Sequence, residues 1–307
     1  HMKNLYNKLF TLIMALILAS CSSNTEEAVV DEEVSEITQE ESIEETAADN
    51  LFYQVPTPNE LFAVLKNSNV EYNRENLSDV SNASNYLTKA SKALNFGVYT
   101  ADLAYVTSLG QMDDASKIFE TVRSLSKDLE IENAVDEVIM KRLQSNLENS
   151  NADSLFYLSN ETYYNAYSYL EENDRRDVLG MIVVGGWIEG LNIILNLEPY
   201  NEGSEVCQRI ADQKLTLENL LIFTSTIEND QLAEIIGELS SIEEVFNYAD
   251  DDVDDSESSE SSEFTSSESA DGVMIFGGGE SNSITEDQFN ELKSIVLDLR
   301  TSIIEGS

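Results

Sequence analysis

The sequence predicts an all-α protein, folded as a single helical bundle of about eight to nine helices. Apolar residues recur at spacings of three and four through most of residues 53–249, whereas strand-like alternation is nowhere sustained. Only three prolines and 13 glycines interrupt the 307 residues, which argues against a turn-rich β fold. An acidic, Ser-rich linker is expected at 250–283, and an amphipathic helix at 284–307 that packs back on the bundle.

The helices follow in chain order from their end signals and apolar stripes. The segment 57–60 (TPNE) is typical of a helix start, with a capping Thr and a Pro at the first helical position. Gly110 is expected to end the long helix before it, and Thr285 with Gln288 gives a capping signal for the last helix. The periodicity between these signals predicts helices over about 82–109, 113–129, 132–148, 153–171 and 175–197, with two or three more by residue 248.

A short α-solenoid is the alternative architecture. Gly110, Ala115 and Phe119 stand at the spacing of the second half of a tetratricopeptide unit, where small residues let two helices close. Asp102 and Leu103, however, occupy the positions where that pattern needs Leu and Gly, and no second copy follows at a 34-residue interval. The bundle is therefore preferred.

The net charge excludes several partners. The chain has 17 Lys and Arg against 59 Asp and Glu, a formal charge of −42, which disfavours nucleic-acid binding. Two stretches without a basic residue, 22–50 with 11 acids and 250–271 with ten, are expected to be disordered. A calcium-loop spacing begins at Asp252, but Glu257 stands where the sharp turn needs Gly, so we expect no specific metal site.

Residue usage also argues against an enzyme and against a cofactor. The single histidine, His1, precedes Met2 and looks like a cloning remnant, which leaves no Ser-His-Asp or Cys-His catalysis and no His-ligated metal. Cys207 is expected to be a buried free thiol. A glycosidase-like pair of carboxylates stays open in principle, but the sequence identifies no such pair.

The N-terminus carries an export signal. Lys3 and Lys8 form a short basic region before a ten-residue apolar run at 9–18 that is too short to span a bilayer, so residues 1–20 are expected to be a signal peptide. The run ends in 18–21 (LASC), which resembles the bacterial lipobox. This resemblance implies that Cys21 is acylated, as by palmitate, and anchors the chain to a membrane, with 21–52 forming an acidic tether.

The residues after the cysteine bear on location. Position 22 is Ser rather than Asp, so the inner-membrane retention signal of enterobacterial lipoproteins is absent, and the acids from Glu26 onward resemble the surface-export signal of Bacteroidota lipoproteins. Segments 95–103 and 178–197 also resemble uncharacterised lipoproteins of Bacteroidota. These resemblances imply an outer-membrane lipoprotein, periplasmic or surface-exposed, and imply no activity.

The segment 178–197 (VLGMIVVGGWIEGLNIILNL) has three interpretations. A helix buried on all sides in the bundle is favoured, with Gly186 and Gly190 at the spacing of a close helix crossing. A transmembrane helix would place Glu189 near the bilayer centre, at a cost of about 2.5–3.5 kcal/mol. The third interpretation is a ligand pocket around Trp187 and Glu189, where the glycines leave room.

Several tyrosines crowd one predicted helix. Tyr163 and Tyr167 are four residues apart, which is ordinary core spacing. Tyr164 and Tyr169 point elsewhere and are candidates for a partner or glycan surface. The favoured function is a non-catalytic helical interaction or scaffold module of the cell envelope with a protein partner. The alternative is a small-ligand or glycan-binding lipoprotein with its pocket near Trp187 and Glu189.

Overall fold

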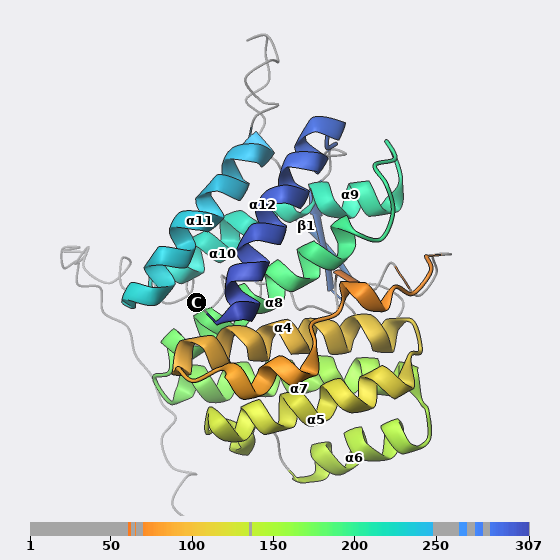
Figure 1. The fold of residues 1–307 in the computed structure, drawn as a ribbon, viewed down its shortest axis with the longest axis vertical. Coiled ribbons are helices and arrows are strands. Elements are labelled where there is room, and N and C mark those ends of the chain that lie inside the picture. The colour runs from red at the N-terminus through yellow and green to blue at the C-terminus, as the bar shows by residue number, and fades with distance from the viewer. Residues whose placement is uncertain are drawn as a thin grey trace, which may run out of the picture. The chain divides into compact units, whose positions relative to one another are not determined.

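A computed structural model confirms the all-α class and the helical bundle. It describes residues 61, 62, 65, 70–134, 137–247, 264–268, 274–278 and 283–306, and of 137–140, 264–268 and 274–278 only the backbone. The described part contains nine α-helices, shown in Figure 1: α4 (Lys89–Ser108), α5 (Met112–Asp128), α6 (Glu137–Glu148), α7 (Ala152–Glu172), α8 (Arg176–Leu195), α9 (Glu205–Ala211), α10 (Gln213–Ser225), α11 (Asp230–Asn247) and α12 (Glu286–Glu305).

The predicted helix ends are largely confirmed. Thr285 and Gln288 form the expected capping box at the start of α12, and Gly110, at φ +68°, follows the end of α4. Two starts were predicted too early, because short 3-10 helices precede α4 at Val80–Asn85 and α6 at Glu132–Ala134. The first of these is rich in Ser and Asn, whose side chains compete with helical hydrogen bonds, so α4 begins only after the Thr88 cap.

Helix α8 lies at the centre of the bundle. It packs most extensively on α4 and also contacts α7, α9, α10, α11 and α12 (Figure 1). Among the described residues it is the one helix long and apolar enough to cross a bilayer, and its apolar window is entirely buried within the fold. Full burial is the state expected of a central bundle helix that is apolar on all sides.

The close crossing of α4 and α8 includes the backbone of the predicted Gly186, but the α8 glycine beside it there is Gly185 and not the predicted Gly190. A Cβ atom at Gly185 would overlap the backbone carbonyl of Leu94, and a Cβ at Gly97 would overlap that of Ile182 and lie 2.6 Å from the amide nitrogen of Gly186. At Gly190 the nearest atom is instead the Leu61 side chain, at 2.6 Å. Gly97 and Gly185 therefore let the two backbones meet, while Gly190 receives a side chain from elsewhere.

The arrangement differs from a solenoid, in which each repeat contacts only its neighbours in sequence. Helix α4 instead packs on α8 and α12, which are distant in sequence. Antiparallel strands β1 (Phe264–Glu268) and β2 (Met274–Gly278) pair within the segment expected to be a linker, with Ser266 opposite Phe276. The apolar, aromatic and β-branched content of the second strand favours this pairing.

Several predictions concern residues outside the described ranges. These are the signal peptide, the lipidation of Cys21, the acidic tether and the acidic stretch 250–263. Of the first predicted body helix, the structure describes Leu61, Phe62 and Leu65, and all three are buried as expected.

Candidate functional site

The two residues predicted to form a pocket on α8 face different neighbours. Trp187 is 5% exposed, and its indole Nε1 donates a hydrogen bond to Oε1 of Gln213 on α10, at 3.0 Å. Glu189 is fully buried and faces Arg300 on α12. The structure therefore holds both side chains with protein groups and does not bring them together at one cavity.

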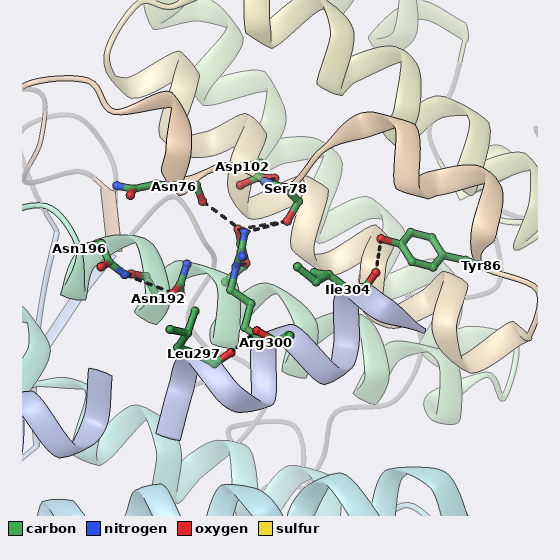
Figure 2. A network of polar contacts seen from close by, with 11 residues as sticks. Asn76, Ser78, Tyr86, Asp102, Asn192, Asn196, Leu297, Arg300 and Ile304 are labelled. Atoms are coloured by element: carbon green, nitrogen blue, oxygen red, sulfur yellow. Dashed lines mark hydrogen bonds and ion pairs between the residues drawn. The ribbon is translucent and has the colours of Figure 1, made fainter. Parts of the chain in front are cut away.

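Glu189 and Arg300 form a two-pronged ion pair in the interior. The Arg300 Nε and Nη2 groups donate to the two carboxylate oxygens, with the Nη2–Oε1 distance at 2.8 Å. Nη2 also donates to the Ser78 hydroxyl at 3.0 Å and to the backbone carbonyl of Asn76 at 3.3 Å (Figure 2). A buried ion pair loses its hydration, and additional hydrogen bonds from its remaining donors, such as these, help to offset that loss.

Asp102 on α4 adds a second buried acid to this cluster. Its Oδ2 accepts the backbone N–H of Ser78 at 3.1 Å, whereas no donor among the described residues reaches its Oδ1. Burial and then the negative charge of the neighbouring Glu189 raise the pKa of Asp102 well above its usual range, against the lowering effect of Arg300. Two buried acids here share one cation, so one of them needs a proton to be neutral, and we assign that proton to Asp102 because its pKa is raised.

Burial and charge also act on Arg300. Burial alone would lower the pKa of this guanidinium, but its hydrogen bonds to Glu189 and the negative charge there outweigh burial and raise it. The cluster thus holds one cation, one anion and one neutral acid. It ties α4, α8, α12 and the segment at 76–78 to each other, which is a structural role.

The cavity with ligand-sized volume lies elsewhere, among helices α4 to α8. Its volume is about 480 Å³, within the range of roughly 300–1,000 Å³ that is typical of small-molecule pockets. Buried side chains from five elements form its inner wall: Leu103, Phe119, Ile131, Leu143, Leu170, Leu179 and Ile182. The adjoining α7 residues Thr162, Tyr163 and Ala166 are half-buried.

Three threonine and serine hydroxyls along the wall are already hydrogen-bonded to backbone carbonyls of their own helices. Thr100 donates to the carbonyl of Phe96, and Thr162 donates to that of Leu158, both at 2.7 Å. Ser159 likewise donates to the carbonyl of Phe156 at 2.7 Å. Because these protons are used internally, the wall presents mostly carbon to a ligand.

Two tyrosines on α7 line this cavity, and they are the pair assigned to the core by sequence. Tyr167 is 5% exposed, and its hydroxyl lies 3.4 Å from the Glu171 carboxylate; burial, and then that charge, raise the pKa of Tyr167. Tyr163 lies one turn earlier on the same wall. Tyr164 and Tyr169, the predicted surface candidates, are half-buried and are not among the described lining residues.

A smaller cavity of about 270 Å³ opens beside the 3-10 segment that precedes α4. It is bordered by two bases, Arg74 and Lys117, and two acids, Asp79 and Asp114, and both bases pair with the Asp114 carboxylate, at 3.3 Å and 3.2 Å. Its charges are therefore already matched by each other, and the larger cavity is the better candidate site.

Other reactive groups offer little chemistry within the described residues. No group of three or more His, Cys, Asp or Glu side chains there is placed to hold a metal ion. Cys207 is a buried free thiol, as predicted.

Sequence reasoning missed the cavity because its wall comes from five helices. The signal present was the Tyr163–Tyr167 spacing of four, which marks a shared helix face but does not distinguish filled core from a cavity wall. Comparison with known proteins adds no analogy: no family model, curated protein or solved structure matches this chain.

Proposed function

We propose that this chain is a membrane-anchored, non-catalytic binding protein of the cell envelope, whose helical body takes an apolar small molecule into the cavity among α4–α8. The observation that carries the proposal is a cavity of about 480 Å³ with a carbon-rich wall, in which the hydroxyls of Thr100, Ser159 and Thr162 already donate to backbone carbonyls. Such a wall favours an apolar ligand, because a polar one would lose its hydration without gaining partners.

The cavity lining also favours binding over catalysis. Glu132 is the one acidic side chain among the described lining residues, and it is exposed. A glycosidase-like mechanism needs two carboxylates that flank one bond, and the buried acids Asp102 and Glu189 belong to the ion-pair cluster instead. The activity proposed is therefore reversible binding.

The apolar surface does not favour the scaffold role that the sequence suggested. The large apolar side chains exposed in the described part are Tyr157 on α7, Ile222 on α10, Leu297 on α12, and Leu87 in the segment before α4. No single helix there presents a stripe of them for a partner. An envelope protein partner stays a prediction from the sequence.

Binding can be measured by displacement of an uncharged fluorescent probe, N-phenylnaphthylamine, from the full chain by primary alcohols of increasing length. Each methylene buried contributes about 0.8 kcal/mol, so affinity should rise about four-fold per carbon until the cavity is filled. Alcohols that fail to displace the probe, or that show no dependence on length, would contradict the proposal.

A cavity-filling variant ties the binding to this cavity. Ala166→Phe adds a ring beside the half-buried wall of α7, so binding should be lost while stability is kept. Ala233→Phe adds the same ring on an exposed position of α11 and should bind as the unmodified chain does. Equal affinities in the two variants would place the ligand elsewhere.

The membrane anchor is a separate part of the proposal, supported by the lipobox resemblance at Cys21. Cys21→Ala should release the protein from the outer-membrane fraction, because acylation has no other site, and single-chain anchoring is already marginal. A variant that still sediments with outer membrane and resists a salt wash would contradict the anchor, without bearing on the cavity.

A further inference from the structure

The α5 border of the cavity carries two basic side chains. Arg123 and Lys127 both line the cavity and are four residues apart, so they lie on one face of α5 about 6 Å apart along its axis. The chain has 17 basic residues among 307, and 59 acids. A pair of bases at the edge of an apolar cavity is therefore an unusual local feature of this protein.

Neighbouring acids do not fully neutralise the positive charge of this pair. Arg123 Nε lies 3.5 Å from Glu120, but both side chains are exposed, at 42% and 62%. Asp128 is turned to Lys92 on α4, at 2.8 Å. Lys127 is exposed, and its side chain makes no hydrogen bond or ion pair within the described residues.

Glu132 is the remaining charge at this border, and it leaves the two bases in excess. The large negative charge of the whole chain acts only weakly here, because ionic screening limits interactions between exposed charges to about 8 Å at physiological salt. The charged side chains that line the cavity are therefore two bases, Arg123 and Lys127, and one acid, Glu132, and Glu120 lies beside Arg123 outside this lining.

The volume of the cavity limits the size of the apolar part of its ligand. At the roughly 30 Å³ that one water-sized group occupies, about 480 Å³ holds on the order of sixteen such groups. A methylene group is similar in size to a water molecule, so the cavity matches one long alkyl chain and is too small for two.

We infer that the ligand is a single-chain amphiphile with an anionic headgroup, such as a fatty-acid anion, whose chain enters the cavity and whose headgroup lies at Arg123 and Lys127. This inference rests on the proposed function, because it assigns the ligand class of the same cavity. Its distinguishing consequence is selectivity: among ligands with the same chain, an anion binds more tightly than an alcohol.

The experiment compares dodecanoate with 1-dodecanol as competitors for the fluorescent probe on the full chain, both below their aggregation concentrations. Exposed ion pairs are weak, so we expect dodecanoate to bind up to about five-fold more tightly at low salt, with the preference falling as salt is added. Dodecyl phosphate should share the preference, since the inference concerns the anionic headgroup rather than the carboxylate.

Lys127→Gln tests the role of this border, and Lys293→Gln, which also removes one positive charge, is its control. Lys127→Gln should reduce the preference for dodecanoate and leave dodecanol binding unchanged, and adding Arg123→Gln should abolish the preference. Lys293→Gln removes one positive charge from α12, away from the described cavity lining, and should keep the full preference.

The outcomes separate the two proposals. Equal binding of anion and alcohol by the unmodified chain, or a preference that survives Lys127→Gln with Arg123→Gln, would overturn the inference and leave apolar binding intact. Failure of both ligands to displace the probe would overturn the proposed function, and the inference with it.

Discussion

Replacing Arg300 by Met tests the account of the buried cluster. Methionine keeps the apolar stem that crosses the interior from α12 but removes the guanidinium that binds Glu189. Glu189 is completely buried, so it would lose its cation without gaining water. The nearest buried titratable group, Asp102, is itself an acid and cannot supply the missing positive charge.

The expected loss is large for a single substitution. Breaking a buried ion pair by removing one partner costs about 3–5 kcal/mol, against a total stability of about 5–15 kcal/mol for a typical domain. The loss also depends on pH. Arg300 lowers the pKa of Asp102, so without Arg300 the folded pKa of Asp102 lies still further above its unfolded value. Stability is then greatest below about pH 4 and is lost as pH rises.

Urea unfolding of the full chain, followed by far-ultraviolet circular dichroism from acid to neutral pH, measures this loss. Arg142→Met is the control, because Arg142 pairs with Glu161 at 3.5 Å with both side chains about half exposed, and such pairs contribute about 0–1 kcal/mol. A loss in Arg300→Met below about 1 kcal/mol at neutral pH, or one that does not grow with pH, would refute the assignment.

Two further predictions concern the same core. Gly185→Ala should lower the free energy of unfolding by about 1–3 kcal/mol, since its Cβ would meet the backbone of Leu94. The control, Gly237→Ala, has open space around its Cβ and should raise the free energy of unfolding by up to about 1 kcal/mol. Equal effects of the two substitutions in urea unfolding would refute the close crossing. Asp102→Asn keeps an oxygen that can accept the Ser78 N–H and removes the titrating proton. Because the folded pKa of Asp102 is raised, its contribution to stability is complete below about pH 4 and is lost as pH rises. The Asp102→Asn variant should therefore gain stability relative to the unmodified chain toward neutral pH. Parallel curves of unfolding free energy against pH would contradict this.

The helices could be predicted because their signals are local. The Thr285 capping box and the end of α4 at Gly110 depend on residues a few positions apart, and periodicity reveals which face of a helix is buried. The continuous apolar sequence of α8 likewise predicted its burial on all sides.

The partners of these faces could not be predicted in the same way. Gly185, and not Gly190, contacts the α4 backbone because the crossing point depends on how two helices distant in sequence meet. Glu189 appeared available for a ligand because nothing near it in sequence identifies Arg300, 111 residues away, as its partner.

The cavity shows the same limit. Arg123, Lys127 and Tyr163 are individually ordinary helix-surface or core residues, and only the way α4 to α8 fold together places them around one space. The tyrosines chosen for exposure, Tyr164 and Tyr169, were the less relevant pair, since spacing alone says which residues share a face but not what that face borders.

The central claim, that the cavity among α4–α8 binds an apolar ligand, is tested most directly by intermolecular nuclear Overhauser effects between bound 1-dodecanol and methyl groups of the full chain. The account predicts contacts from the alkyl chain to Leu143 and Val122, which line the cavity, and none to Leu297, which is exposed on α12. Saturable binding with contacts at Leu297, and none at Leu143 or Val122, would contradict it.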